Sequence, residues 1–83
     1  MTEKILKFSA SWCSPCKLLT ESLKVNEIGI PVEEIDIDVE EKLTAEYNIR
    51  SIPTLIYLKD GYEVSRIHGN KSIEDIKKWI NNS

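Results

Sequence analysis

Segments with the apolar spacing of strands and of helices alternate along this chain, and their order limits the possible folds. Residues 4–9 (KILKFS) form an apolar run with β-branched and aromatic members, which is typical of a strand. Three leucines then recur at helical spacing and predict a helix over residues 14–25. A second strand is predicted over residues 32–38 (VEEIDID). A strand, a helix and a strand in this order predict a parallel pair joined by a right-handed crossover.

The second half of the chain carries a further helix-type segment and a hairpin. Residues 40–49 (EEKLTAEYNI) combine good helix formers with apolar residues four apart, and they predict a short helix. A third strand is expected to begin at Thr54, where a β-branched and aromatic run follows a proline. Asp60–Gly61 lies between two apolar runs, which is a strong hairpin signal, so residues 63–67 are expected to form the returning strand.

A capping signal marks the last helix. Gly69 is expected to end the returning strand, and Ser72 with Asp75 three residues later indicates a helix start. The complete order is β-α-β-α-β-β-α. In 83 residues this order predicts one α/β domain over residues 1–83, with a four-stranded mixed sheet flanked by three helices.

The charge and hydropathy of the chain exclude several classes of function. A formal net charge of −3 gives no basic footprint for nucleic acid or for an anionic membrane. No segment approaches the roughly 18 apolar residues that a membrane-spanning helix needs. The apolar run near the N-terminus is too short for a signal peptide. We therefore expect a cytoplasmic protein that binds neither nucleic acid nor membranes, in a compartment where structural disulfides are disfavoured.

The chain has two cysteines, Cys13 and Cys16, within the segment SASWCSPCKLL. A structural disulfide between them would close a very small loop and add little stability. A structural zinc site needs four ligands, and the chain offers only His68 besides the cysteines. We therefore expect no metal, unless two copies share a site, and we expect His68 to be an ordinary surface or strand residue.

The position of the cysteine pair indicates redox chemistry instead. Cys13 is expected at the helix N-terminus, where unpaired backbone N–H groups and the helix dipole favour an anion. Its thiol should therefore ionise first and act as the nucleophile. Cys16 lies one turn deeper and would attack a mixed disulfide formed at Cys13. Pro15 stiffens the turn between the two cysteines and removes a competing donor.

The motif WCSPCK and the later segment NIRSIPTLIYLKDG together closely resemble the thioredoxin family. The resemblance covers residues 5–81, with two separated motifs in the same order. It implies a thioredoxin-like fold and a cis Ile52–Pro53 bond that faces the cysteines. It also implies that the Ile52 backbone pairs with the substrate chain, that Trp12 packs beside the active site, and that Gly69 leaves room for substrate. The alternatives are plain core packing of Trp12 and an ordinary trans proline.

The resemblance further implies an enzyme, a protein-disulfide reductase acting in electron transport and cell redox homeostasis. The cysteine pair would need no added cofactor, and a thioredoxin-reductase-like or glutathione-based reductant would reset it. Protein disulfides are the implied substrates, and a monomer is expected. Ser14, Pro15 and Lys17 surround the cysteines and are expected to support the site.

Two alternative functions stay open at this point. One is a glutathione-coupled glutaredoxin-like or thiol-oxidising protein. Against it, the segment HGNKSIED has Asn70 and Lys71 where glutaredoxins carry a paired acidic motif. The other is a non-catalytic binding module of the same fold, which binds a partner at the surface around the cysteines and in which redox chemistry is incidental.

The chain departs from the family pattern in two places. The usual N-terminal strand and helix are missing, which gives the shorter layout typical of glutaredoxins and compact thioredoxins. In addition, Lys7 stands where the family places a buried aspartate, and Glu34 stands where it places the partner lysine. Our hypothesis is a charge-swapped pair in which Glu34 accepts the proton of Cys16 and Lys7 holds Glu34 in place, because a buried unpaired ammonium is costly. The alternative is a snorkelling lysine and a solvated glutamate.

Overall fold

The order of strands and helices predicted from the sequence is confirmed. The computed structural model describes residues 2–83, and these residues form four strands and three helices. The elements are β1 (Glu3–Ser9), α1 (Ser14–Val25), β2 (Val32–Asp36), α2 (Glu41–Glu46), β3 (Thr54–Lys59), β4 (Tyr62–His68) and α3 (Ile73–Asn81).

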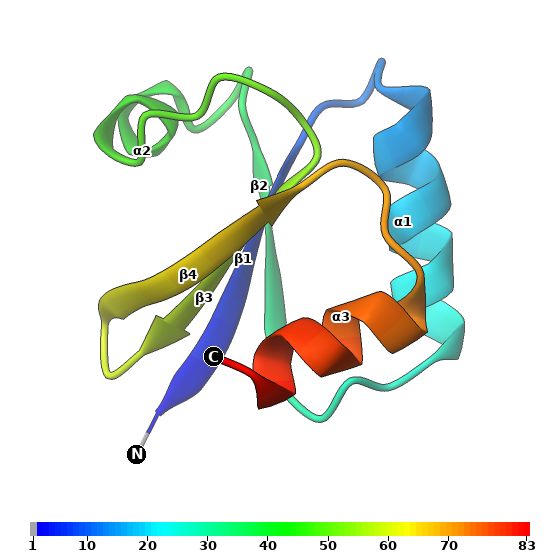
Figure 1. Cartoon of the computed structure of the whole chain (residues 1–83). Helices are drawn as coiled ribbons and strands as arrows, with labels where there is room; N and C mark the ends of the chain where they lie inside the picture. The colour runs from blue at the N-terminus through cyan, green and yellow to red at the C-terminus, as the bar shows by residue number, and fades with distance from the viewer. Residues whose placement is uncertain (1) are drawn as a thin grey trace.

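The strands form one mixed sheet in the order β2-β1-β3-β4 (Figure 1). β1 pairs in parallel with β2. This is possible because α1, which connects the two strands, returns the chain to the end of the sheet at which β1 begins. β1 also pairs antiparallel with β3, and β3 pairs antiparallel with β4. β1 is therefore a central strand, with the segment that carries both cysteines at its C-terminal end.

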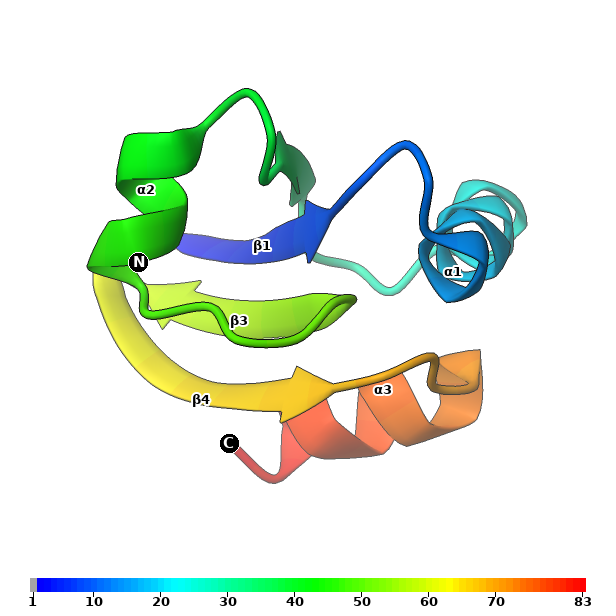
Figure 2. The ribbon, with the colours of Figure 1, turned by 90° about the horizontal axis from the view of Figure 1, so that it is seen from above.

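Helices cover both faces of the sheet. One core cluster joins β1 and β3 to α1 and α3 through Ile5, Leu19, Leu55, Tyr57 and Ile76. A second cluster on the opposite face packs Leu43 and Tyr47, from α2 and its C-terminal end, against the strands. Figure 2 shows the sheet lying between α2 on one side and α3 on the other. The alternating side chains of the strands thus supply two separate apolar layers.

The β3–β4 hairpin turns at the predicted dipeptide. Asp60 and Gly61 have φ angles of 53° and 86°. A tight turn of this kind needs positive φ at both central positions, which aspartate tolerates and glycine adopts without steric cost. The returning strand extends one residue further at each end than predicted, from Tyr62 to His68.

Two elements are shorter than the sequence predicts. The strand predicted over residues 32–38 ends at Asp36, whose side chain accepts a hydrogen bond from the Asp38 backbone N–H at 2.9 Å. This bond turns the chain out of the sheet. The helix predicted over residues 40–49 ends at Glu46, because Asn48 adopts a positive φ of 54°.

Candidate active site

Cys13 is the N-cap residue of α1, as predicted from the sequence. Its backbone is extended, with φ −93° and ψ 107°, while the helix begins at Ser14 with Pro15 in the first turn. The backbone N–H of Cys16 donates a hydrogen bond to the Cys13 Sγ at 3.2 Å. This donor and the positive end of the helix dipole both favour negative charge on the Cys13 sulfur, and so favour its thiolate.

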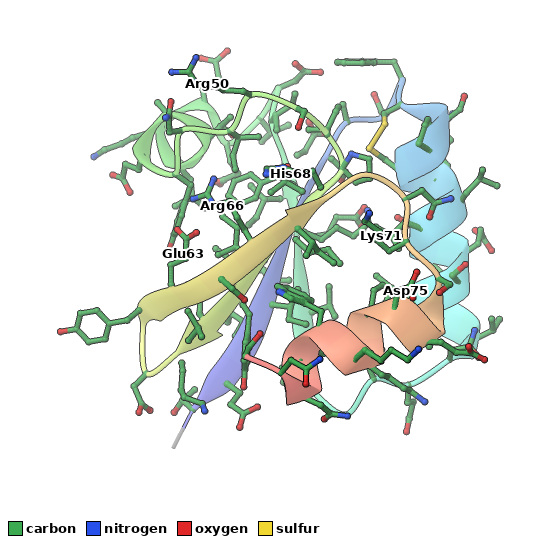
Figure 3. The ribbon with its side chains drawn as sticks, in the orientation of Figure 1. Arg50, Glu63, Arg66, His68, Lys71 and Asp75 are labelled. Carbon is green, nitrogen blue, oxygen red and sulfur yellow. A yellow bond between two sulfur atoms is a disulfide. The ribbon has the colours of Figure 1, made fainter. Side chains whose placement is uncertain are left out.

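Cys13 and Cys16 form a disulfide, with their Cα atoms 5.2 Å apart. Figure 3 shows the bond at the end of α1 that lies nearest the C-terminal end of β4. Cys13 is 6% exposed and Cys16 is 1% exposed. The difference confirms that Cys16 lies deeper, and it leaves Cys13 as the sulfur that an approaching reactant reaches more easily.

Two loops from other parts of the chain pack against the cysteines. Ala10 and both cysteines form a buried cluster, and Ile37 and Ile52 contact it from the segments after β2 and before β3. The Ile52–Pro53 peptide bond is cis, as the family resemblance implies. The sheet geometry therefore brings the loop before β3 to the disulfide, although the two segments are distant in the sequence.

Gly69 lies next to the loop that contains Pro53. Its backbone N–H donates to the Pro53 carbonyl oxygen at 2.8 Å, and its φ is +85°. A side chain at this φ would be strained, while the space above the Gly69 Cα is open. The contact fixes the end of β4 against the cis-proline loop.

Trp12 lies at the surface beside the disulfide. Its side chain is 65% exposed, so plain core packing of Trp12 is wrong. Its indole N–H donates to Asp38 Oδ2 at 2.9 Å, and the Asp38 backbone is itself held by Asp36. Sequence reasoning missed Asp38, because no local pattern indicates that the turn after β2 reaches residue 12.

Lys7 and Glu34 form an ion pair, with 2.9 Å between Lys7 Nζ and Glu34 Oε1. The two residues face each other in the β1–β2 register. Lys7 is 1% exposed, so a snorkelling surface lysine is wrong, whereas the Glu34 side chain is 54% exposed. Lys7 and Glu34 therefore form the predicted charge-swapped pair, in which the ammonium group is buried and the carboxylate is exposed to solvent.

The hydroxyls of Ser9 and Thr20 also donate to Glu34 Oε1, at 3.1 Å and 3.2 Å. The hydrogen bond from Lys7 lowers the pKa of Glu34, and burial opposes that effect in part. The same Thr20 hydroxyl lies 3.0 Å from the Cys16 carbonyl oxygen, so its single proton can bond to this carbonyl or to the Glu34 carboxylate. Sequence reasoning missed both hydroxyl residues. Ser9 bonds to the Glu34 carboxylate, and Thr20 lies between this carboxylate and the Cys16 backbone.

A cavity of about 430 Å³ lies beside this network. Ser9, Cys16, Thr20, Glu34 and Asp36 are among its lining residues. Cys16 and Glu34 thus face one space that is large enough for several water molecules.

The remaining predicted residues lie around the pair. Ser14, Pro15 and Lys17 are exposed on the first turns of α1. His68 is the exposed last residue of β4, as expected. Its Nδ1 lies 3.0 Å from the Thr54 hydroxyl oxygen and therefore at the base of the cis-proline loop.

No metal cluster or membrane-spanning helix is found in the described part of the chain. Within residues 2–83, no three histidine, cysteine or acidic side chains are grouped as metal ligands. None of the helices in this range is both long enough and apolar enough to cross a bilayer.

Comparisons with known proteins agree with this geometry. The family model for thioredoxin matches residues 2–82. The chain is 39% identical over 80 residues to the thioredoxin of Chlamydia caviae, covering 93% of this chain and 78% of that protein. It is 36% identical over 78 residues to the thioredoxin of Bacillus subtilis, covering 89% and 75% of the two chains.

Solved structures agree as well. A mutant thioredoxin from Halobacterium salinarum matches with a TM-score of 0.88 at 28% identity, covering 96% of this chain and 73% of that one. Fasciola hepatica thioredoxin matches with a TM-score of 0.87 at 27% identity, covering 98% and 80%. These matches show that the chain belongs to the thioredoxin family, whose thiol-disulfide oxidoreductase chemistry uses a cysteine pair such as Cys13 and Cys16.

Proposed function

We propose that Cys13 is the nucleophile and Cys16 the resolving thiol in the reduction of target-protein disulfides. The observation that carries this assignment is the position of Cys13 at the N-cap of α1, where its sulfur accepts the Cys16 backbone N–H. The greater exposure of Cys13 supports the same order of attack.

The proposed reaction has two exchange steps. The Cys13 thiolate attacks one target sulfur, a bond forms between Cys13 and the target, and the other target sulfur leaves as a thiolate. Cys16 then gives up its proton and attacks the Cys13 sulfur, so that the Cys13–Cys16 disulfide forms and the second target sulfur leaves. Two electrons pass to the target, and the protein ends in the disulfide form that the structure contains.

The proposed docking surface surrounds Cys13. Trp12 offers an exposed aromatic face on one side, and the Ile52–Pro53 loop with Gly69 forms the other side. Open space at Gly69 supports a role in accepting a target chain, and Ile52 supports one by contacting the cysteine cluster. Ser14, Pro15 and Lys17 are proposed to shape the turn between the cysteines and the surface next to it.

Glu34 is proposed to accept the Cys16 proton during the second step, with Lys7 as a positioning residue. The cavity that both residues line supports this role, and so does the Thr20 hydroxyl, which lies within hydrogen-bond distance of the Glu34 carboxylate and of the Cys16 carbonyl oxygen. Because the hydrogen bond from Lys7 lowers the pKa of Glu34, its carboxylate is ionised where the thiols react, and the same effect makes it a weaker base.

The cellular setting is proposed from the family. We place the protein in the cytoplasm as a monomer that works with no cofactor besides its cysteine pair. A thioredoxin-reductase-like or glutathione-based reductant would return the disulfide to two thiols. No feature of the site favours a glutathione-coupled protein or a binding module over the thioredoxin-type reaction.

Replacing the cysteines one at a time tests the assignment. Cys13→Ser should abolish reduction of a disulfide-bonded test protein, because the first exchange cannot occur. Cys16→Ser should instead trap a covalent complex with the test protein through Cys13, visible by mass spectrometry and released by dithiothreitol. A complex trapped through Cys16 in the Cys13→Ser variant, and none through Cys13, would show that the roles are reversed.

A further inference from the structure

Charge is divided unevenly between the two segments that border the disulfide. Ile37 follows β2 and Ile52 precedes β3, and both contact the cluster that contains the cysteines. The chain around Ile37 is strongly acidic, while the chain around Ile52 has no acidic residue. A target that reaches the disulfide must therefore lie between surfaces of different charge.

The acidic side is the segment 33–41. It contains no lysine or arginine and holds six of the chain's 14 acidic residues, namely Glu33, Glu34, Asp36, Asp38, Glu40 and Glu41. The hydrogen bond from Trp12 to Asp38 fixes this segment next to Cys13. Glu33 and Glu34 are paired with Lys4 and Lys7, and the other four carboxylates make this border of the disulfide negatively charged.

The opposite side consists of two loops without acidic residues, 47–53 and 68–72, which we call the cationic loops. Arg50 lies two residues before Ile52, and Lys71 lies two residues after Gly69. Both side chains are exposed, and neither forms an ion pair within residues 2–83. In Figure 3, Arg50 lies beside α2, His68 lies at the end of β4, and Lys71 lies between β4 and α1, with Asp75 next to it.

Hydrogen bonds hold the cationic loops together. The Thr54 hydroxyl donates its single proton to the Ser51 carbonyl oxygen at 2.7 Å. Nδ1 of His68 lies 3.0 Å from the Thr54 hydroxyl oxygen and 3.4 Å from the Ser51 hydroxyl oxygen, so the imidazole ring joins the end of β4 to the loop before β3. With the bond from Gly69 to Pro53, this contact fixes the loops relative to each other. The cations are displayed on a preorganised surface, which limits the entropy lost on binding.

We propose that the cationic loops select target proteins with acidic side chains on one flank of the attacked disulfide. The segment 33–41 repels acidic side chains on the other flank and accepts neutral or basic ones. The inference rests on the proposed function, because it concerns the targets of the same cysteine pair. Charges arranged in this way set partner choice and association rate more than total affinity.

A peptide series tests the proposal. Each peptide has one cysteine in a disulfide with mercaptoethanol, and three residues on either its N-terminal or its C-terminal flank are all Glu, all Gln or all Lys. The rate constant for reaction with the reduced protein is measured by stopped flow at low salt. On one flank, Glu peptides should react about threefold to tenfold faster than Gln peptides, and on the other flank the order should reverse.

Variants assign the preference to the two loops. In Arg50→Gln/Lys71→Gln, the Glu-to-Gln rate ratio on the preferred flank should fall close to one. Lys77→Gln/Lys78→Gln is the matched control, because it removes the same charge from exposed positions on α3, and it should keep the wild-type ratio.

Two results would overturn the proposal. Equal ratios on both flanks, or equal losses in the two double variants, would mean that only the overall charge matters. In both cases the Gln peptides would still react, and the proposed function would stand. A reduced protein that reacts with none of the peptides would overturn the proposed function as well.

Discussion

At the scale of single residues, the Glu34 carboxylate accepts several of the side-chain hydrogen bonds near the cysteines. One oxygen, Oε1, accepts hydrogen bonds from Lys7, Ser9 and Thr20. The buried ammonium of Lys7 needs such a partner, because an uncompensated buried charge costs several kcal/mol. The same contacts orient Glu34 toward the cavity that Cys16 lines.

Replacing this carboxylate should change the pH dependence of the second exchange step. In Glu34→Gln, resolution of a mixed disulfide at Cys13 should slow by roughly tenfold at neutral pH. This is less than a well-matched base provides, because the lowered pKa of Glu34 makes its carboxylate a weak proton acceptor. The difference should vanish at alkaline pH, where a thiol ionises without help. Single-turnover rates from pH 6 to about pH 10 would measure this.

A second variant separates proton transfer from electrostatics. Glu34→Gln also leaves the Lys7 charge unbalanced, which by itself favours a thiolate nearby. In Lys7→Met/Glu34→Gln both charges are absent. If the double variant regains the wild-type profile, the effect is electrostatic and Glu34 is not the proton acceptor. An unchanged profile in Glu34→Gln alone would contradict the role directly.

Sequence reasoning identified part of this residue-scale network. The positions of Lys7 and Glu34 predicted a pair once the family resemblance was recognised, and the strand register confirms it. Ser9 and Thr20 were not predicted, because serine and threonine occur widely in strands and helices. Only the packing of α1 against β1 brings their hydroxyls to one oxygen.

At the scale of elements, the N-termini of α1 and α3 agree best with the boundaries predicted from the sequence. Cys13 caps α1 and Ser72 caps α3, and both boundaries follow from residues within one turn. The ends of β2 and α2 were predicted less well. The side chain of Asp36 ends β2, and the left-handed backbone of Asn48 ends α2, although the apolar patterns of both segments continue for two or three more residues.

Removing the α3 cap should destabilise the protein measurably. The Ser72 hydroxyl oxygen accepts the Asp75 backbone N–H at 3.1 Å, and this bond satisfies one of the free donors of the first turn. Ser72→Ala should lower the free energy of unfolding by about 1 kcal/mol, measured by urea denaturation. Ser72→Asp restores a capping oxygen and should recover most of the loss. Equal losses in both variants would show that the cap contributes little.

At the scale of the whole molecule, two small hydrophobic cores, one on each face of the sheet, hold the elements that carry the site in place. The cluster between the sheet and helices α1 and α3 holds the helix that carries the cysteines. The cluster on the α2 face holds the turn that reaches Trp12. In a chain of this size each large buried side chain contributes a sizeable share of the stability.

Truncating the first core should therefore have a large effect. Ile76 is completely buried between α3 and the sheet. Ile76→Ala should reduce the free energy of unfolding by about 2–5 kcal/mol, seen as a lower urea midpoint with an unchanged slope. Leu18→Ala is the control, because Leu18 is exposed on α1 and its truncation should cost less than about 0.5 kcal/mol. Similar losses in both variants would contradict the assignment of the core.

Local sequence patterns predict the order of the elements, the hairpin turn, the caps of α1 and α3, and the place of the cysteine pair at a helix N-terminus. Each of these depends on residues a few positions apart, whose spacing and backbone preferences act locally. Contacts between residues that are distant in the sequence follow only from the packing of the strands and helices. The bonds from Lys7 to Glu34 and from Trp12 to Asp38 join residues 27 and 26 positions apart. These bonds exist because strand register and helix packing place the segments side by side, which no local pattern specifies.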